Sequence, residues 1–141
     1  MTAAATRPWL GHASPLATVR VTQHAAADGN VVGLVNVPSD GLYQRSHFPG
    51  FAVFPGVFVA ELCGRLALEL VDQTPVPWAV TKICALRLVA PVYPGDRLEI
   101  SAQRNLSELI APGCRAVSVR SRVTRAGRVV ATARLTIEPQ R

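Results

Sequence analysis

The stretch PGVFVAELCGRLALELV, residues 55–71, decides the fold. Its hydrophobic residues are spread over nearly every side of a helical projection, and good helix formers follow Val59. Pro55 precedes the apolar run and is typical of a helix start. The pattern predicts one helix over residues 57–71, and its apolar character on almost all sides predicts that this helix is buried.

Segments with strand-like composition lie on both sides of this helix. They are predicted at residues 16–24, 30–37, 78–88, 96–106, 117–124 and 129–137. The last two alternate most clearly and flank the turn Arg125-Ala126-Gly127-Arg128, which predicts a half-solvated antiparallel hairpin. One helix can be covered on all sides only if a curved antiparallel sheet wraps around it. The predicted class is therefore α+β with a single helix, and the strand order stays open.

The composition bounds the domain organisation. At 141 residues the chain is expected to form a flexible segment over residues 1–14 and one domain over residues 15–141. Hydrophobic residues make up 49% and charged residues 17%, which excludes a disordered chain and suggests that a partner subunit covers part of the surface. No apolar run is long enough to span a membrane, and no signal peptide is apparent. Three cysteines without CxxC spacing indicate a reducing cytoplasm and argue against a zinc site.

The net charge of +6 comes almost entirely from arginine, since Lys82 is the one lysine. A basic surface can attract nucleic acid, a membrane or an acidic protein. Nucleic acid is the weakest of these, because aromatic residues make up only 6%. The stripe Arg120, Arg122 and Arg134 is either a solvated sheet face or a docking patch, and the sequence leaves both open.

The stretch HFPGFAVFPGVFVAEL, residues 47–62, carries the candidate chemistry. A carboxylate at Glu61, among apolar neighbours, must be paired, hydrogen-bonded or protonated. A helix that begins at Pro55-Gly56 presents free N–H groups that can hold a developing oxyanion. His47 stands just before a proline-braced loop and is a candidate base.

This stretch resembles the 3-hydroxyacyl-acyl carrier protein dehydratases of the FabZ and FabA kind. Their motif is His-Phe-Pro, a spacer, Pro-Gly-Val and an acidic residue on the central helix. Here Glu61 follows His47 by fourteen positions and Gly56 follows it by nine, as in the family. The resemblance extends over residues 15–138, and RLVAPVYPGDRLEI looks like the family's strand–turn–strand hairpin.

The resemblance implies a hot-dog fold, in which a curved antiparallel sheet wraps the central helix. It also implies a homodimer, with His47 of one subunit facing Glu61 of the other, and family members often assemble further into a trimer of dimers. In this family pattern His47 is the base, Glu61 donates a proton or activates water, and the carbonyl of Val53 fixes the His47 tautomer. The N–H groups of Gly56 and Val57 bind the oxyanion. The substrate would arrive on the phosphopantetheine of an acyl carrier protein or on coenzyme A, and no metal or redox cofactor is implied.

The chain departs from the family pattern at several positions. Arg65 replaces a usual glutamine one turn after Glu61, and a cation there favours the ionised carboxylate. Either Arg65 points toward solvent or Glu61 acts mainly by holding water. Phe51 and Ala52 replace a usual His-Pro pair, which points to a specialised, polyketide-type pathway.

Other interpretations stay open beside the dehydratase. A hot-dog thioesterase would also use a carboxylate near a helix start, and a non-catalytic acyl-binding subunit would keep the fold alone. Glu61 could serve only as a partner of Arg65, and Gly56 could serve only tight packing.

Overall fold

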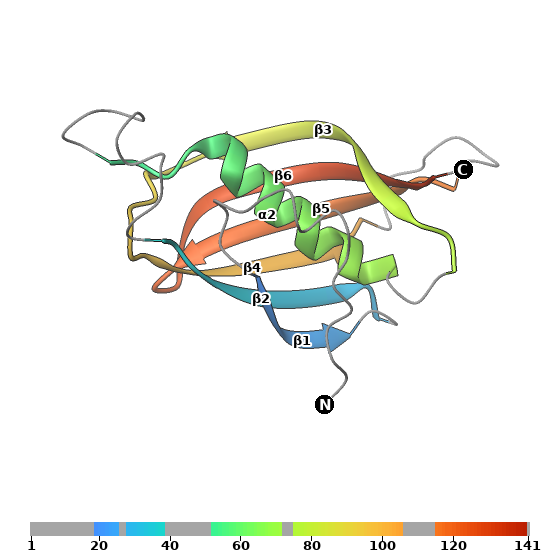
Figure 1. Cartoon of the computed structure of the whole chain (residues 1–141), viewed down its shortest axis with the longest axis horizontal. Coiled ribbons are helices and arrows are strands. Elements are labelled where there is room, and N and C mark those ends of the chain that lie inside the picture. The colour runs from blue at the N-terminus through green and yellow to red at the C-terminus, as the bar shows by residue number, and fades with distance from the viewer. Residues whose placement is uncertain (1–18, 26–27, 39–51, 72–74, 106–114, 141) are drawn as a thin grey trace.

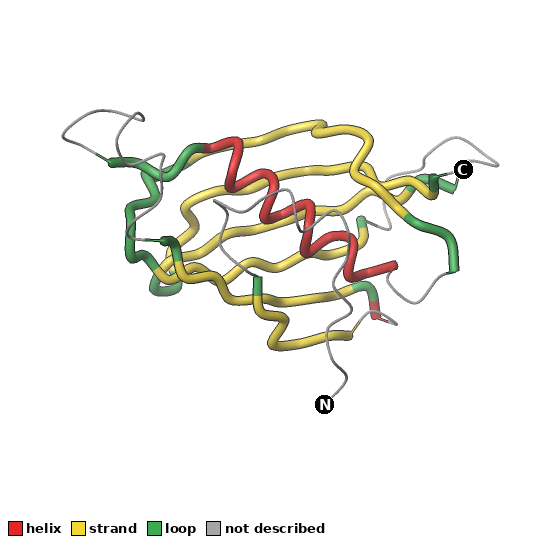
Figure 2. The backbone as a smooth tube through the Cα atoms, viewed as in Figure 1, coloured by secondary structure: helices red, strands yellow, loops and turns green. Residues whose placement is uncertain are grey.

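The computed structural model describes residues 19–25, 28–38, 52–71, 75–105 and 115–140. In this part of the chain a six-stranded antiparallel sheet curves around one α-helix, which lies diagonally across one of its faces (Figures 1 and 2). The elements are β1 (Arg20–Ala25), β2 (Asn30–Asn36), α2 (Gly56–Leu68), the 3-10 turn η3 (Glu69–Val71), β3 (Trp78–Leu88), β4 (Arg97–Arg104), β5 (Val117–Arg125) and β6 (Arg128–Pro139). The predicted α+β class is confirmed.

The strand order is β1-β2-β4-β5-β6-β3, and every neighbouring pair is antiparallel. The predicted hairpin between β5 and β6 is confirmed. Its turn residues Ala126 and Gly127 have φ angles of 50° and 78°. Positive φ at both central positions matches the twist of the strands that they join.

The predicted strand–turn–strand hairpin over RLVAPVYPGDRLEI is wrong. β3 pairs with β6 at one edge of the sheet, whereas β4 lies between β2 and β5. Residues 89–96 therefore carry the chain across the end of the sheet rather than around a tight turn. A local turn signal fixes where the chain bends, but the partner of each strand depends on contacts between residues far apart in the sequence.

The core lies between α2 and the inner face of the sheet. On the helix, Leu62 and Leu66 are fully buried, and they belong to the same cluster as Ile100 of β4 and Leu135 of β6. Gly33 of β2 lets the strand approach the helix, because a Cβ there would lie 3.1 Å from Leu66 Cδ1. Truncation of such a leucine to alanine typically costs about 2–5 kcal/mol.

The helix is not covered on all sides, which corrects the prediction from its composition. Val57 is 67% exposed, and the side chain of Glu61 one turn later is 54% exposed. The edge strand β3, which contacts α2, also carries exposed apolar residues at Ile83 and Leu86. Within one chain, a side of the helix and the β3 edge thus remain uncovered.

Candidate active site

The start of α2 presents free backbone donors. Pro55 is its N-cap residue in an extended conformation, and no side chain caps the helix. The carbonyl of Pro55 accepts hydrogen bonds from the N–H groups of Phe58 and Val59. The N–H groups of Gly56 and Val57 donate to no group in the described part of the chain. The helix therefore begins with two open donors at its positive end, which suit an anionic oxygen.

Phe54 fixes the segment that leads into the helix. Its N–H donates to the carbonyl of Val92 at 2.7 Å, and its buried ring meets Phe58 edge-on at 5.5 Å between centroids. The helix start is thereby held against the crossing segment of residues 89–96 (left side of Figures 1 and 2).

An ion pair holds this crossing segment in turn. Asp96 Oδ2 accepts hydrogen bonds from the N–H of Tyr93 at 2.8 Å and from Arg125 Nη1 at 2.6 Å. Arg125 Nη1 also donates to the carbonyl of Pro91 at 2.8 Å. Gly95 takes the positive φ of 83° that the turn requires. The Pro-Gly-Asp sequence thus shapes a rigid wall beside the helix start.

A pocket of about 400 Å³ lies between this wall and the helix start. Its lining is entirely apolar in side-chain character: Val53, Phe54, Gly56, Val59, Leu88, Val89, Ala90, Pro91 and Val92. Leu88 lies directly over Gly56, because a Cβ on Gly56 would be 2.5 Å from Leu88 Cδ1. An acyl chain could fill such a pocket while its thioester carbonyl faces the donors of the helix start.

Glu61 lies about 7.5 Å further along the helix axis than Gly56, at 1.5 Å per residue. Its Oε1 accepts a hydrogen bond from Arg65 Nε at 3.4 Å. Only 11% of the Arg65 side chain is exposed, and its buried Nη2 has no partner. Of the alternatives left open by the sequence, the structure therefore has Arg65 paired with Glu61 and not pointing toward solvent. The expected burial of the helix does not hold at Glu61, because its carboxylate lies on the uncovered side within one chain.

Comparison with known proteins decides the family. The ApeI-like family, described as ApeI dehydratase, matches residues 23–113. The chain belongs to the ApeI-like dehydratase family. The sequence resemblance to 3-hydroxyacyl-acyl carrier protein dehydratases is thereby confirmed.

Two FabZ 3-hydroxyacyl-acyl carrier protein dehydratases illustrate the relationship. The enzyme of Nitratidesulfovibrio vulgaris is 36% identical over 98 residues, which cover 64% of this chain and 63% of that protein. The enzyme of Geobacter metallireducens is 28% identical over 113 residues, covering 75% of this chain and 70% of that protein. The match thus spans just under two thirds of the first enzyme's length.

Solved structures confirm the hot-dog fold. The dehydratase heterocomplex ApeI:P of Xenorhabdus doucetiae superposes with a TM-score of 0.65 at 15% identity, over 86% of this chain and 96% of that one. A hypothetical thioesterase of Streptococcus pneumoniae with coenzyme A gives a TM-score of 0.65 at 17% identity, over 87% of this chain and 89% of that one. At these identities the likeness shows the fold alone.

The candidate site is thus described in part. Val53 and Gly56 line the pocket, Val57 follows at the helix start, and Glu61 and Arg65 lie about one and a half and two and a half turns beyond Gly56. His47 lies outside the described residues. The described residues contain no group of three or more His, Cys, Asp or Glu side chains that could hold a metal ion, and none of their helices is long and apolar enough to cross a membrane.

The sequence prediction missed the wall formed by Leu88 and the residues up to Val92. An apolar run at the end of a strand does not by itself indicate that its side chains line a site. Only the pairing of β3 with β6, at the edge of the sheet, brings it against the helix start.

Proposed function

We propose that this ApeI-like protein dehydrates a 3-hydroxyacyl thioester to the trans-2-enoyl thioester. One observation supports this best: open N–H donors, an apolar pocket and a carboxylate occur together along the first two turns of α2. The substrate would be carried on the phosphopantetheine of an acyl carrier protein or on coenzyme A, in fatty acid or polyketide-type biosynthesis. The reaction removes a proton and a hydroxide, so it needs no redox cofactor. We propose that it takes place in the cytoplasm.

In this proposal His47 removes the proton alpha to the thioester carbonyl. Negative charge then develops on the carbonyl oxygen, where the N–H groups of Gly56 and Val57 stabilise it. A donor of this kind is typically worth about 3–4 kcal/mol in the transition state. The carbonyl of Val53 would fix the tautomer of His47, so that the ring nitrogen facing the substrate is free to accept the proton.

Glu61 serves the departing hydroxyl group. Arg65 Nε donates to Oε1 of Glu61, so the carboxylate is held in place on the uncovered side of the helix. We therefore assign Glu61 the role of holding and orienting a water molecule, rather than that of a free general acid. This water gives a proton to the departing hydroxyl group, and the hydroxide that it becomes takes up the proton that His47 removed.

The proposed assembly is a homodimer, and a trimer of dimers is its possible extension. β3 is an edge strand of the described sheet, and exposed apolar side chains accompany its open backbone groups. A second copy paired along β3 would continue the sheet and cover the open side of α2. The family resemblance implies that His47 of the second copy would then face Glu61. The ApeI:P dehydratase is a heterocomplex, which raises a different chain as an alternative partner. The mass of the purified protein in solution distinguishes a homodimer from a monomer that needs such a partner.

The deciding assay supplies 3-hydroxybutyryl thioester on an acyl carrier protein and records enoyl absorbance and free thiol in parallel. We expect enoyl product without thiol release, and at least a ~100-fold loss of rate in Glu61→Gln and in His47→Ala. Glu99→Gln and His24→Ala serve as matched controls, because both residues are exposed and lie away from the pocket. Thiol release without enoyl product would identify a thioesterase, and acyl binding without turnover would identify a non-catalytic subunit. Either result overturns the proposal.

A further inference from the structure

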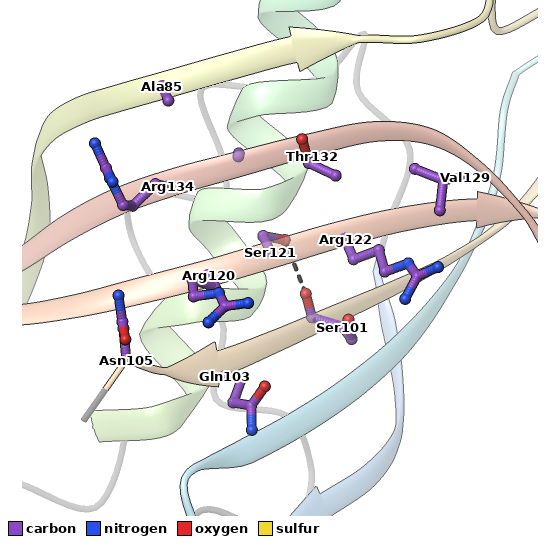
Figure 3. A pocket seen from close by; sticks show the side chains of 11 residues that line it. Ala85, Ser101, Gln103, Asn105, Arg120, Ser121, Arg122, Val129, Thr132 and Arg134 are labelled. Atoms are coloured by element: carbon purple, nitrogen blue, oxygen red, sulfur yellow. Dashed lines mark hydrogen bonds between the residues drawn. The ribbon is translucent and has the colours of Figure 1, made fainter. Parts of the chain in front are cut away.

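Three arginines stand on the face of the sheet that points away from α2. Arg120 and Arg122 lie on β5, and Arg134 lies on β6. Figure 3 shows their side chains in front of the sheet, with the helix behind it. They alternate along their strands with buried residues such as Val119 and Leu135, which face the helix. The sheet therefore separates these arginines from the pocket at the start of α2.

The register places the arginines side by side. Arg120 lies directly opposite Arg134 across the β5–β6 pair, and Gln103 of β4 lies opposite Arg120 on its other side. Like charges directly opposite one another destabilise a sheet. The three arginines are exposed, and none makes a salt bridge or hydrogen bond with another described residue. No direct salt bridge or hydrogen bond within the described chain thus offsets this repulsion.

The arginines border a hollow of about 800 Å³ on the outer face. Short side chains at Ala85, Ser101 and Thr132 leave room between the longer ones (Figure 3). Gln103 and Asn105 add amide groups at one end. The result is a concave surface with three guanidinium groups and several neutral hydrogen-bonding groups.

We propose that this hollow, the outer arginine face, docks an acidic helix of a partner protein. A guanidinium fork binds a carboxylate through two parallel hydrogen bonds. Neighbouring strands lie about 5 Å apart, which sets the separation of Arg120 from Arg134. Acidic residues at i and i+4 of a helix are about 5–6 Å apart, so one helix face can meet both arginines.

Two other occupants fit less well. A second copy that docked through this same face would set arginine against arginine, because a two-fold contact pairs each patch with itself. Single-stranded nucleic acid is usually bound by aromatic stacking, and the described residues that line the hollow include no aromatic side chain. The proposal goes beyond the dehydratase proposal and does not depend on it, since the hollow and the pocket lie on opposite faces of the sheet.

The test uses the full chain and a fluorescein-labelled helical peptide with glutamate at every fourth position. We expect Arg120→Gln/Arg134→Gln to weaken binding at least ~10-fold in fluorescence anisotropy. The matched control Arg20→Gln/Arg128→Gln removes the same charge at exposed positions outside the hollow, and it should weaken binding less than ~2-fold. A peptide with glutamine in place of glutamate should not bind.

A single charge reversal distinguishes a loss of peptide binding from a loss of folding stability. Arg134→Glu turns the repulsive pair with Arg120 into an attractive one, so the melting temperature should stay constant or rise while peptide binding is lost. Equal weakening by both double variants would overturn the proposal, because it would show attraction by net charge alone. Absence of binding in the wild-type chain, or tighter binding of a short DNA through the same arginines, would also overturn it.

Discussion

Arg65 reaches back one turn of α2 and donates its Nε to Oε1 of Glu61 at 3.4 Å, while 11% of its own side chain stays exposed. The arginine stem is packed, and the carboxylate that it holds is open to solvent. This asymmetry suggests that Arg65 orients Glu61 toward the uncovered side of the helix.

We predict that Arg65→Met lowers the rate of dehydration, because it removes the group that orients Glu61, but leaves the stability of the fold nearly unchanged. The methionine preserves apolar volume but removes the donor to Glu61, so kcat for dehydration should fall about 10-fold with little change in KM. The free energy of unfolding should change by less than about 1 kcal/mol, because the ion pair is partly exposed and Nη2 has no partner to lose. Steady-state kinetics and urea unfolding check both values. Arg65→Lys should restore part of kcat. An unchanged kcat in Arg65→Met would show that Arg65 does not position Glu61.

Gly56 provides a second test at the helix start. In Gly56→Ala the new methyl group would meet Leu88 Cδ1 at 2.5 Å, and Leu88 can move because its side chain is flexible and 54% exposed. We expect a small change in melting temperature and a loss of kcat of about 10-fold or more, because the displaced Leu88 side chain changes the shape of the pocket that it lines beside the donors.

Gly64→Ala is the matched control for this substitution. Gly64 is buried on the same helix, and its added methyl group would lie 3.0 Å from Val80 Cγ2 in β3. This variant should lose stability by about 1–3 kcal/mol and retain kcat per folded molecule. Thermal unfolding and active-site-normalised rates distinguish the two. Full activity in Gly56→Ala would mean that the glycine serves packing alone.

Local signals made part of this structure predictable. Pro55-Gly56 marks the start of α2, and Ala126-Gly127 marks the β5–β6 turn, because each depends on the backbone preferences of adjacent residues. The motif spacing likewise placed Gly56 and Glu61 on the first two turns of one helix.

Other features depend on contacts that the sequence pattern does not encode. The pairing of β3 with β6 joins residues that are about fifty positions apart, such as Ile83 and Leu135, and alternation cannot choose that partner. The apolar character of α2 could not tell whether its own sheet or a partner subunit covers Val57. The apolar wall at Leu88 depends on this strand pairing and on how the helix is covered, so the sequence pattern could not predict it.

The edge of β3 should form the subunit contact. In Ile83→Lys/Leu86→Lys two ammonium groups occupy exposed apolar positions of this strand, and lysine on an edge opposes strand pairing. We expect the wild-type chain to elute at twice its monomer mass or a multiple of it, and the double variant to elute as a monomer. Size-exclusion chromatography with light scattering measures the masses.

Val21→Lys is the control for this contact, because Val21 is an exposed apolar residue of the opposite edge strand, β1. It should leave the dimer intact. A dimer that survives the β3 substitutions would place the contact elsewhere. A wild-type monomer would contradict the homodimer and direct attention to a different chain as partner.

Cys63 should make the stability of the fold decrease at alkaline pH. Burial raises the pKa of its thiol from 9.0 to about 11, although a hydrogen bond with Ser121 offsets part of the effect. In the unfolded chain the thiol ionises through pH 9, whereas in the folded chain it stays neutral until about pH 11. The stabilisation is therefore complete below pH 9 and is lost as the pH rises to 11. A shift of about two units corresponds to about 2–3 kcal/mol.

Urea unfolding of the wild type and of Cys63→Ala between pH 8 and 11 measures this loss. The substitution removes the thiol but leaves every other titrating group, so the difference in unfolding free energy between the two proteins should shrink by about 2–3 kcal/mol over that range. Iodoacetamide should leave Cys63 unmodified in the folded protein at pH 8, because the reactive thiolate is suppressed. Rapid alkylation there, or parallel curves for the wild type and Cys63→Ala, would show that the helix is open at this position and that β5 does not seal it.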